Sequence, residues 1–572
     1  MNILRDLRSA FAKGAPEKAD GAEFAHAVKA VADPKFGDYQ ANGCMALRKT
    51  LGRDPRELAQ EVVGRVDLDA IADPLEIAGP GFINVRLKNE YLAALLSESL
   101  KDEGRGLDRA EPSKTIVVDF SSPNVAKPMH VGHLRSTVIG DSLARILESL
   151  GHRVVRDNHL GDWGAQFGMI IWGWKNERDE AAFAADPVHE LARLYRLVQT
   201  RIKSGEKSIE DAARLETVKL HQGDPENRAL WERFNPACLN ALHSVYERLN
   251  IRFDVELGES FYDPMLAEVV ADLKARGMAV ESEGATVVFV PGSKTPFLIQ
   301  KTDGAFNYST TDLATIQYRR ATWNPDRVLY VVDHRQSDHF KLLFDVAKRW
   351  GFENIDMVHV PFGTILGKDR RPYKTREGDV IGLESLLDEA VSEARKVIDA
   401  NSPELDETER ARVAEVVGLG AIKYADLSQN RLSDYVFDWS KMLAMNGNTA
   451  TYLQYAYARI QNIFRKCETT PELVRALAPP IVLSRPSERA LGLAVLQFPE
   501  AVETAADELK PNVLTDDLFD LANKFSTFYE DCPVFSAETP ALRSSRLALC
   551  DLTSRTLRFG LELLGIDVVD RM

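Results

Sequence analysis

Apolar residues change their spacing twice between positions 115 and 160, and each change predicts a different element. Residues 115–120 form a short, mainly apolar run bounded by polar residues, which is typical of a buried strand. Residues 131–150 repeat apolar side chains at helical spacing, and Gly151 is a favourable helix stop. A second strand-like run follows immediately. Strand, helix and strand in this order predict a parallel sheet.

The same strand–helix–strand order returns in residues 327–360, so two such units are expected to share one sheet. Between them, residues 175–300 carry charged helical patterns and one β-like stretch, which we interpret as an insertion. From about 380 onward the apolar spacing is almost wholly helical. The pattern predicts an α/β fold: a Rossmann-type parallel-sheet domain with an insertion, an N-terminal α+β domain and a C-terminal all-α helical bundle.

A chain of 572 residues exceeds one hydrophobic core, so several domains are expected. Residues 101–114 are charged and contain glycine, which is the composition of a linker. We predict a first unit at 1–112, a sheet domain at 113–380, a helical connecting region at 381–446 and a helical domain at 447–572.

Composition and charge narrow the class of protein. No apolar run approaches the ~18 residues needed to cross a bilayer, and the N-terminus lacks the apolar core of a secretion signal. The five cysteines are scattered without a C-x-x-C pair, which indicates reduced thiols and argues against a zinc site. These features predict a cytoplasmic protein with no membrane contact. The net charge of −15 argues against a nonspecific nucleic-acid binder, although local patches can still hold a shaped RNA.

Two histidines open the helical pattern that follows the first strand of the sheet domain. His130 and His133 stand three residues apart with Gly132 between them, so both rings project from one side of the helix. A strand, a loop and a helix N-terminus form an anion-binding layout, since free N–H groups and the helix dipole favour an anion there. The pattern alone also allows a capping or core role for these histidines. Lys127, in the preceding loop, is by itself compatible with a solvated surface lysine.

Residues 123–133, PNVAKPMHVGH, resemble the HIGH signature of class I aminoacyl-tRNA synthetases, in the extended form of the arginyl-tRNA synthetases. The string NHLGDWGAQFG at 158–168 and the Y-x-x-x-D pattern at 308–312 are also similar to that family, and family-like strings occur in every unit. The resemblance implies a two-step ligase that uses ATP with Mg²⁺, L-arginine and tRNA(Arg), without zinc. It also implies a monomer that needs bound tRNA to activate arginine.

For the ATP half of the site, the resemblance implies that Lys127, His130 and His133 are catalytic, with Gly132 beside them. The lysine-rich KMSKS loop of many class I synthetases corresponds to residues 367–376, which depart from that motif. A subset of arginyl-tRNA synthetases is similar, and in it the lysine at the position of Lys127 is expected to take over part of the work. The candidate ATP-binding residues in the loop are Lys368, Lys374 and Arg376.

Selection of arginine requires oxygen acceptors arranged for the planar fork of a guanidinium. Tyr308 and Asp312 stand four residues apart and share one face if the segment is helical, although a helix start with a solvated Asp gives the same pattern. The resemblance favours recognition of the amino acid. The arginine-binding residues that it implies are Asp119, Ser122, Asn124, His159, Tyr308, Asp312 and Gln336.

The resemblance implies two sites for the RNA. Phe82 and Asn84 lie two apart in a strand and resemble a pair that recognises a base of the tRNA D-loop, which makes the first unit a D-loop recognition domain. A half-buried hairpin gives the same pattern. The last unit resembles an anticodon-binding domain, in which Tyr529 and Met572 are the candidates for stacking on bases.

Two alternatives stay open at the level of sequence. One is a class I synthetase for another amino acid, but a glutamate enzyme needs a cationic pocket where Asp119 and Asp312 stand, and a cysteine enzyme needs a zinc-binding Cys/His set. The other is a non-catalytic tRNA-binding paralogue, and the intact Lys127, His130 and His133 argue against it.

Overall fold

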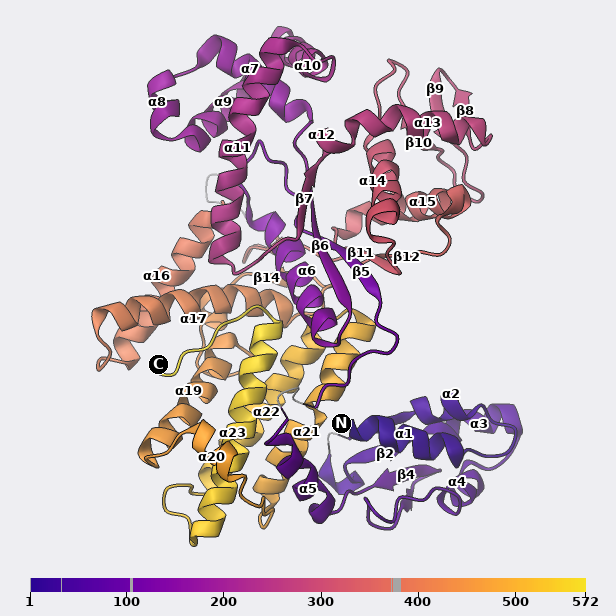
Figure 1. The fold of residues 1–572 in the computed structure, drawn as a ribbon, viewed down its shortest axis with the longest axis vertical. Coiled ribbons are helices and arrows are strands. Elements are labelled where there is room, and N and C mark those ends of the chain that lie inside the picture. Colours follow the sequence, from indigo (N-terminus) through magenta and orange to yellow (C-terminus); the bar gives the residue numbers. More distant parts are fainter. Residues whose placement is uncertain (1, 32, 103–105, 372, 374–381) are drawn as a thin grey trace.

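The computed structural model describes every residue except 1, 32, 103–105, 372 and 374–381. Figure 1 shows a central sheet with a small N-terminal domain at the lower right, two lobes at the top and a helical bundle at the lower left.

The N-terminal domain is built on an antiparallel sheet with the strand order β1 (Val28–Ala30), β2 (Tyr39–Ala41), β4 (Phe82–Val85) and β3 (Glu76–Ala78). Its helices are α1 (Ile3–Lys13), α2 (Gly21–His26), α3 (Gly43–Leu51) and α4 (Pro55–Val63), and α5 (Asn89–Ser99) follows the sheet. Helix α1 begins where the Asn2 side chain accepts a hydrogen bond from the backbone N–H of Arg5. It buries Ile3, Leu7 and Phe11, which recur at helical spacing.

A five-stranded parallel sheet forms the centre of the molecule. Its strand order is β12 (Asp356–His359), β11 (Arg327–Tyr330), β5 (Thr115–Asp119), β6 (Arg153–Leu160) and β7 (Val255–Gly258). The continuous apolar run suits β5 because both of its faces are covered, and Val117 and Val118 are fully buried. Strand β7 lies within the range expected for the insertion, yet it pairs with β6 and extends the main sheet.

Helix α6 (Val131–Ser149) connects β5 to β6 and is buried along most of its length. A Cβ at Gly140 would lie 2.2 Å from Cγ of Phe120, so glycine lets the helix lie directly on the end of β5. The helix that starts at the histidine motif is therefore fixed by close packing.

Two lobes extend from the ends of β6 and β7. The first is helical: α7 (Ala165–Glu177), α8 (Glu180–Ala185), α9 (Pro187–Lys203), α10 (Lys207–His221) and α11 (Pro225–Arg248). The second contains α12 (Glu259–Tyr262), α13 (Leu266–Ala275), the antiparallel strands β8 (Ala279–Ser282), β9 (Ala285–Val288) and β10 (Phe297–Gln300), and α14 (Tyr308–Trp323). The chain then returns through β11, α15 (Ser337–Ala347) and β12 to complete the parallel sheet.

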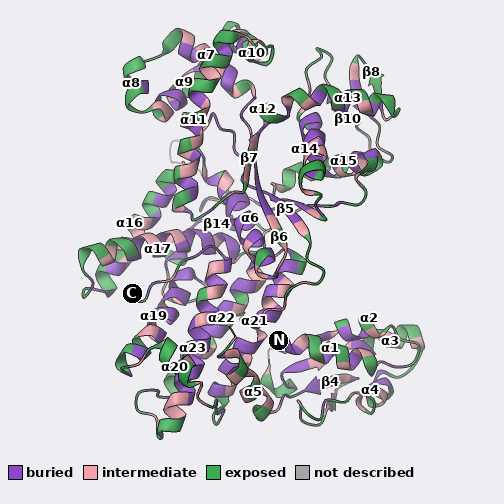
Figure 2. Ribbon diagram, viewed as in Figure 1, coloured by how far each residue is buried: buried purple, intermediate pink, exposed green. Residues whose placement is uncertain are grey.

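The C-terminal part is almost wholly helical. Its helices are α16 (Leu383–Asn401), α17 (Glu407–Leu427), α18 (Trp439–Met442), α19 (Ala450–Lys466), α20 (Pro471–Leu477), α21 (Pro486–Glu508), α22 (Pro511–Asp531) and α23 (Pro540–Leu563). Short parallel strands, β13 (Ile365–Leu366) and β14 (Tyr435–Val436), lie at its border with the sheet domain. Figure 2 shows buried positions along α17, α22 and α23, all of which contact α6. The predicted fold class is confirmed in all three parts.

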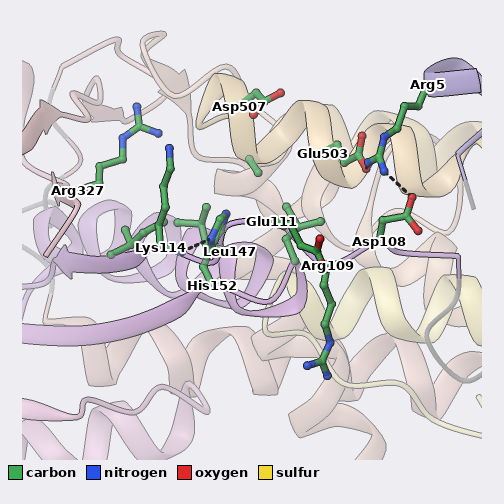
Figure 3. Close-up of a pocket in the computed structure, with 14 residues that line it drawn as sticks. Arg5, Asp108, Arg109, Glu111, Lys114, Leu147, His152, Arg327, Glu503 and Asp507 are labelled. Atoms are coloured by element: carbon green, nitrogen blue, oxygen red, sulfur yellow. Dashed lines mark hydrogen bonds and ion pairs between the residues drawn. The ribbon is translucent and has the colours of Figure 1, made fainter. Parts of the chain in front are cut away.

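A cavity of about 690 Å³ lies at the amino ends of the sheet strands, between α1, the linker and α21 (Figure 3). Arg5 ties its walls together through ion pairs with Asp108 at 2.7 Å and Glu503 at 2.6 Å. Acidic and basic side chains are mixed around it, so it lacks the single positive sign that favours a phosphate site. We interpret it as a junction between domains, at the edge of the sheet away from the histidine motif.

Candidate active site

The candidate site lies where the strand order reverses. From β5 the chain continues to β6 on one side, whereas β11 lies on the other side, and open α/β sheets bind ligands at the carboxyl ends of strands at such a switch point. Asp119 ends β5 and pairs with Tyr330, which ends β11. The histidine motif follows Asp119, and the segment containing Gln336 follows Tyr330. Two segments far apart in the sequence therefore open from one edge of the sheet.

His130 and His133 cap the first turn of α6 reciprocally. The backbone N–H of Gly132 donates to Nδ1 of His130 at 3.1 Å, and the backbone N–H of His130 donates to Nδ1 of His133 at 3.1 Å. The ring centroids are 4.0 Å apart. Since Nδ1 accepts in both rings, each neutral imidazole carries its proton on Nε2, and within the described part of the chain that N–H has no hydrogen-bond partner. A capping role and a phosphate-donor role are therefore compatible in the same two side chains.

Burial keeps both rings neutral. It lowers the pKa of His130, and the Lys127 ammonium lowers it further. Burial also lowers the pKa of His133 to about 3, with the neighbouring His130 as the next cause. At pH 7 the two rings act as hydrogen-bond donors rather than as cations. A Cβ on Gly132 would lie 2.9 Å from ring atoms of His130, so glycine leaves room for the cap.

Lys127 supplies the positive charge beside these neutral rings. Its Nζ lies 5.0 Å from the centroid of the Tyr195 ring on α9, which is within the range of a cation–π contact. Tyr195 is buried, and its hydroxyl accepts a hydrogen bond from Gln199 at 2.8 Å. The helical lobe thus holds Tyr195 against Lys127. Sequence analysis did not identify Tyr195, because an aromatic residue in a helical repeat has the pattern of an ordinary core residue.

Only residues 367–371 and 373 of the loop that corresponds to KMSKS lie within the described part of the chain. Gly382, which follows the loop, forms a backbone bridge with His130. At its other end Lys368 is exposed and pairs with Asp438 at 3.7 Å. Lys374 and Arg376 lie outside the described residues.

The residues predicted to bind the guanidinium stand near the starts of α14 and α15. Asp312 Oδ2 accepts a hydrogen bond from Nε2 of His339 at 2.6 Å. The His339 ring centroid lies 4.8 Å from that of Tyr308. Gln336 immediately precedes α15 and is exposed. His339, which was not among the predicted residues, therefore contacts two of them, Tyr308 and Asp312.

Asp119 is buried and already paired. Its Oδ1 accepts a hydrogen bond from the Ser122 hydroxyl at 3.0 Å, and its Oδ2 accepts one from Arg319 at 2.7 Å. Arg319 also binds Asp157 at 2.9 Å, and burial raises the pKa of Asp157. Asp119 and Ser122 are thus held together at the end of β5, but Arg319 neutralises part of the Asp119 charge.

Asn124 and His159 lie on the β6 side of the same edge. Asn124 forms a parallel backbone bridge with Gly161, where a Cβ would lie 2.5 Å from the Asn124 Oδ1 atom. The His159 ring centroid lies 5.3 Å from that of Tyr262 in α12. Both predicted residues therefore flank the end of β5.

Glu259 is a candidate that sequence analysis missed. It begins α12 directly after β7 and is half-buried. Burial raises the pKa of its carboxyl, the charge of His159 lowers that pKa, and the charges of Asp162 and Asp312 raise it. Among the described residues no lysine or arginine forms an ion pair with Glu259 or with Asp312, which suits a cationic ligand. The sequence signal for Glu259 was an acidic residue directly after a strand. That strand lay within residues 175–300, which the sequence pattern had led us to interpret as an insertion.

The predicted D-loop residues share one face of the N-terminal sheet. Asn84 is buried, and its Oδ1 accepts a hydrogen bond from the side chain of Gln40 on β2 at 2.7 Å. Phe82 is half-buried two residues earlier on β4. The ring and the two amides form a single surface, with Gln40 as a member that the sequence did not indicate.

The predicted anticodon residues lie on the helical bundle. Tyr529 on α22 is 40% exposed. The Arg459 guanidinium on α19 lies 5.1 Å from the Tyr529 ring centroid and 4.7 Å from that of Tyr455. Met572 packs partly against the hydrophobic core at the end of the chain. Tyr455 and Arg459 thus extend the surface that Tyr529 begins.

The described residues contain neither a cluster that could hold a metal ion nor a helix that could cross a membrane. No three His, Cys, Asp or Glu side chains in this part of the chain are grouped to hold a metal ion. No helix that the structure describes combines the length and the apolar content needed to cross a membrane.

Comparison with known proteins gives three family models that together match most of the chain. "Arginyl tRNA synthetase N terminal domain" matches residues 2–87, "tRNA synthetases class I (R), catalytic domain" matches 95–439, and "DALR anticodon binding domain" matches 453–572. A curated arginine–tRNA ligase of Rhodopirellula baltica is 42% identical and covers 100% of both chains. Another, of Escherichia fergusonii, is 46% identical over 95% of each chain.

Solved structures agree. The arginyl-tRNA synthetase of Thermus thermophilus superposes with a TM-score of 0.84 at 26% identity, over 100% of both chains. That of Plasmodium falciparum gives 0.83 at 29% identity, over 100% of this chain and 99% of the other. Identity over the full length, three matching domains and the shared fold show that this chain belongs to the arginyl-tRNA synthetases, a family of class I aminoacyl-tRNA ligases.

Proposed function

We propose that the chain joins L-arginine to the 3′ end of tRNA(Arg) in two steps. In the first, a carboxylate oxygen of arginine attacks the α-phosphorus of ATP, the bond to the bridging oxygen breaks, and pyrophosphate leaves. In the second, a terminal ribose hydroxyl of the tRNA attacks the arginyl carbonyl, the bond to AMP breaks, and the hydroxyl proton is released. The observation that carries the proposal is the pair of mutually capped histidines at the start of α6, at the carboxyl edge of the parallel sheet.

The phosphate half of the reaction depends on charge that grows as pyrophosphate leaves. The Nε2–H groups of His130 and His133 can donate to phosphate oxygens, and preorganised donors of this kind stabilise a transition state. Neutral rings suit the task because they leave the Lys127 ammonium beside them as the cation. Lys127 then contributes a mobile point charge to the triphosphate. Further ATP contacts are proposed from the two sequence motifs: Gly132 from the histidine motif, and Lys368, Lys374 and Arg376 from the loop that corresponds to KMSKS.

The arginine half depends on oxygen acceptors. Asp312 and Glu259 give the guanidinium two carboxylates, with the Tyr308 hydroxyl and Gln336 as proposed neutral partners. The ammonium and carboxylate ends are assigned to the edge of β5, through Asp119, Ser122, Asn124 and His159. Because Arg319 already neutralises part of Asp119, we expect Asp119 to contribute less to arginine binding than Asp312 does.

The remaining proposals concern partners and conditions. Phe82 and Asn84 are proposed to contact the tRNA D-loop, and Tyr529 and Met572 the anticodon. Mg²⁺ is proposed to arrive with ATP, since phosphate oxygens can supply the hard ligands that it prefers and the described carboxylates are scattered. A monomer in the cytoplasm rests on the family resemblance, and the five buried, unpaired cysteines support a reducing compartment.

ATP–pyrophosphate exchange, measured with each amino acid in the presence and absence of tRNA(Arg), tests the proposal. Of the amino acids tested, only arginine should support exchange. That exchange should require tRNA(Arg). Exchange with another amino acid would support a different class I specificity. Retention of tRNA without any exchange would support a non-catalytic paralogue.

A further inference from the structure

The His339 imidazole lies at the centre of the proposed guanidinium corner. It is 11% exposed, and its Nε2 lies 2.6 Å from Oδ2 of Asp312. The ring stacks on Phe297 at 5.8 Å with an interplanar angle of 24°, and contacts Tyr308 at 4.8 Å. An imidazole held by rings on two sides has little freedom to turn. Packing against Phe297 and Tyr308 therefore restricts its orientation in addition to the hydrogen bond to Asp312.

Asp312 depends on this contact. Among the described residues its carboxylate has no other hydrogen bond or ion pair, and it is 26% exposed. A carboxylate at a helix start with one partner can rotate about its side-chain torsions. A hydrogen bond from a fixed N–H restricts that rotation, and it leaves Oδ1 and the remaining lone pair of Oδ2 as acceptors. A planar guanidinium requires two oxygens in a defined plane.

We propose that His339 is a positioning residue for arginine selection: its Nε2–H orients the Asp312 carboxylate, and its ring supports Tyr308, so that both face the guanidinium. The inference rests on the proposed function and adds to it a residue that connects the first turns of α14 and α15. His339 does not act on the reacting phosphate, since Lys127, His130 and His133 lie on the α6 side of the site. The expected defect of its loss is in arginine affinity and not in the ATP step.

Three substitutions separate positioning from packing. His339→Leu removes the donor and keeps bulk. His339→Asn keeps a polar amide that is too short to reach Asp312. His339→Gln places an amide N–H near the position of Nε2. The arginine KM should rise about tenfold to a hundredfold in the Leu and Asn variants, the usual scale for losing a hydrogen bond to a charged group, and by only about threefold or less in the Gln variant.

The assay is ATP–pyrophosphate exchange at saturating tRNA(Arg), with the KM of arginine and of ATP measured for each variant. The ATP KM should stay within about twofold of wild type, because the proposed ATP contacts are untouched. Selection of arginine over citrulline, measured as a ratio of kcat/KM values, should fall in the Leu and Asn variants. Citrulline is the neutral analogue whose oxygen would face the carboxylate, so misplacing the carboxylate weakens discrimination.

His243→Gln is the matched control. His243 on α11 pairs with a carboxylate in the same way, Nε2 to Glu256 Oε2 at 2.7 Å, but lies outside the proposed binding residues. Its kinetics should match wild type. Unchanged arginine KM in His339→Asn, or equal increases in the arginine and ATP KM, would overturn the proposal. Lack of arginine-dependent exchange in the wild-type protein would instead overturn the proposed function.

Discussion

The backbone N–H of His130 donates to Nδ1 of His133 across 3.1 Å. This bond places the proton of a neutral His133 on Nε2, because Nδ1 is occupied as an acceptor. The backbone N–H of Gly132 likewise donates to Nδ1 of His130, which places the proton of a neutral His130 on Nε2. The helix cap therefore prepares two donors for an anion without using a charged side chain.

Removal of either donor should lower the rate of adenylate formation. His130→Ala and His133→Ala are each expected to reduce kcat for ATP–pyrophosphate exchange by ~10²-fold or more, the scale for one lost transition-state donor. His133→Asn separates the loss of the phosphate donor from the loss of the helix cap, since the asparagine side-chain oxygen can still accept a hydrogen bond from the His130 N–H. Asn at 133 should restore thermal stability but not the rate. Near-normal exchange in both alanine variants would rule out the donor role.

The neutral state of His133 predicts a pH effect on stability. Its folded pKa of about 3 lies below the ordinary value of 6.5, so the unfolded chain binds one more proton between these limits. The stabilisation is complete above pH ~6.5 and is lost progressively as the pH falls towards ~3. His133→Gln has no titrating ring and should lose less stability between pH ~7 and ~5, measured by urea unfolding. The same pH dependence in wild type and variant would contradict a buried neutral ring.

Lys127 is predicted to be the main cation of the first step. Lys127→Ala should reduce pyrophosphate exchange more than Thr375→Ala or Lys368→Ala, because the 367–376 loop departs from KMSKS and Lys368 is exposed and paired. Tyr195→Leu should lower the rate by about 2–30-fold through loss of the cation–π contact, whereas Tyr195→Phe should keep it. If Lys127→Ala leaves adenylate formation intact, Lys127 does not take over the work of the KMSKS loop.

Asp312 is predicted to select arginine. Asp312→Asn should raise the arginine KM far more than the ATP KM, since removal of one buried partner of a charge pair costs roughly 2–5 kcal/mol. Glu259→Gln should show the same direction with a smaller effect, because burial already disfavours its charged form. Steady-state exchange with each substrate varied in turn measures both values. Equal increases for arginine and ATP would identify Asp312 as structural.

The two proposed RNA surfaces should act independently. Phe82→Ala and Tyr529→Ala should each weaken tRNA binding by about 1–3 kcal/mol, the scale of a lost base–aromatic stack, and the double variant should be close to additive. At limiting tRNA both variants should also show weaker exchange, which saturating tRNA restores. Filter retention gives the affinities. If folded Tyr529→Ala binds tRNA normally, the anticodon contact must lie elsewhere, with the neighbouring Tyr455 and Arg459 as the next candidates.

The fold class and the family could be predicted from the sequence because both depend on local order. The apolar run at 115–120, the helical repeat after it and the histidine motif between them are contiguous, and short-range spacing defines each. Tyr308 and Asp312 were predicted to share a helix face by the same logic, and α14 begins at Tyr308. The roles assigned to these residues stay predictions until they are measured.

What the sequence alone determined was therefore the type and order of the elements and the motifs carried within single segments. The tertiary structure decided which distant side chains join them. Glu259 reaches the site because β7 pairs with β6, Tyr195 because the helical lobe places α9 beside Lys127, and His339 because α15 packs on α14. Each is separated from its partner by 27 or more positions, a distance over which spacing carries no information and only sheet pairing and helix packing decide contact.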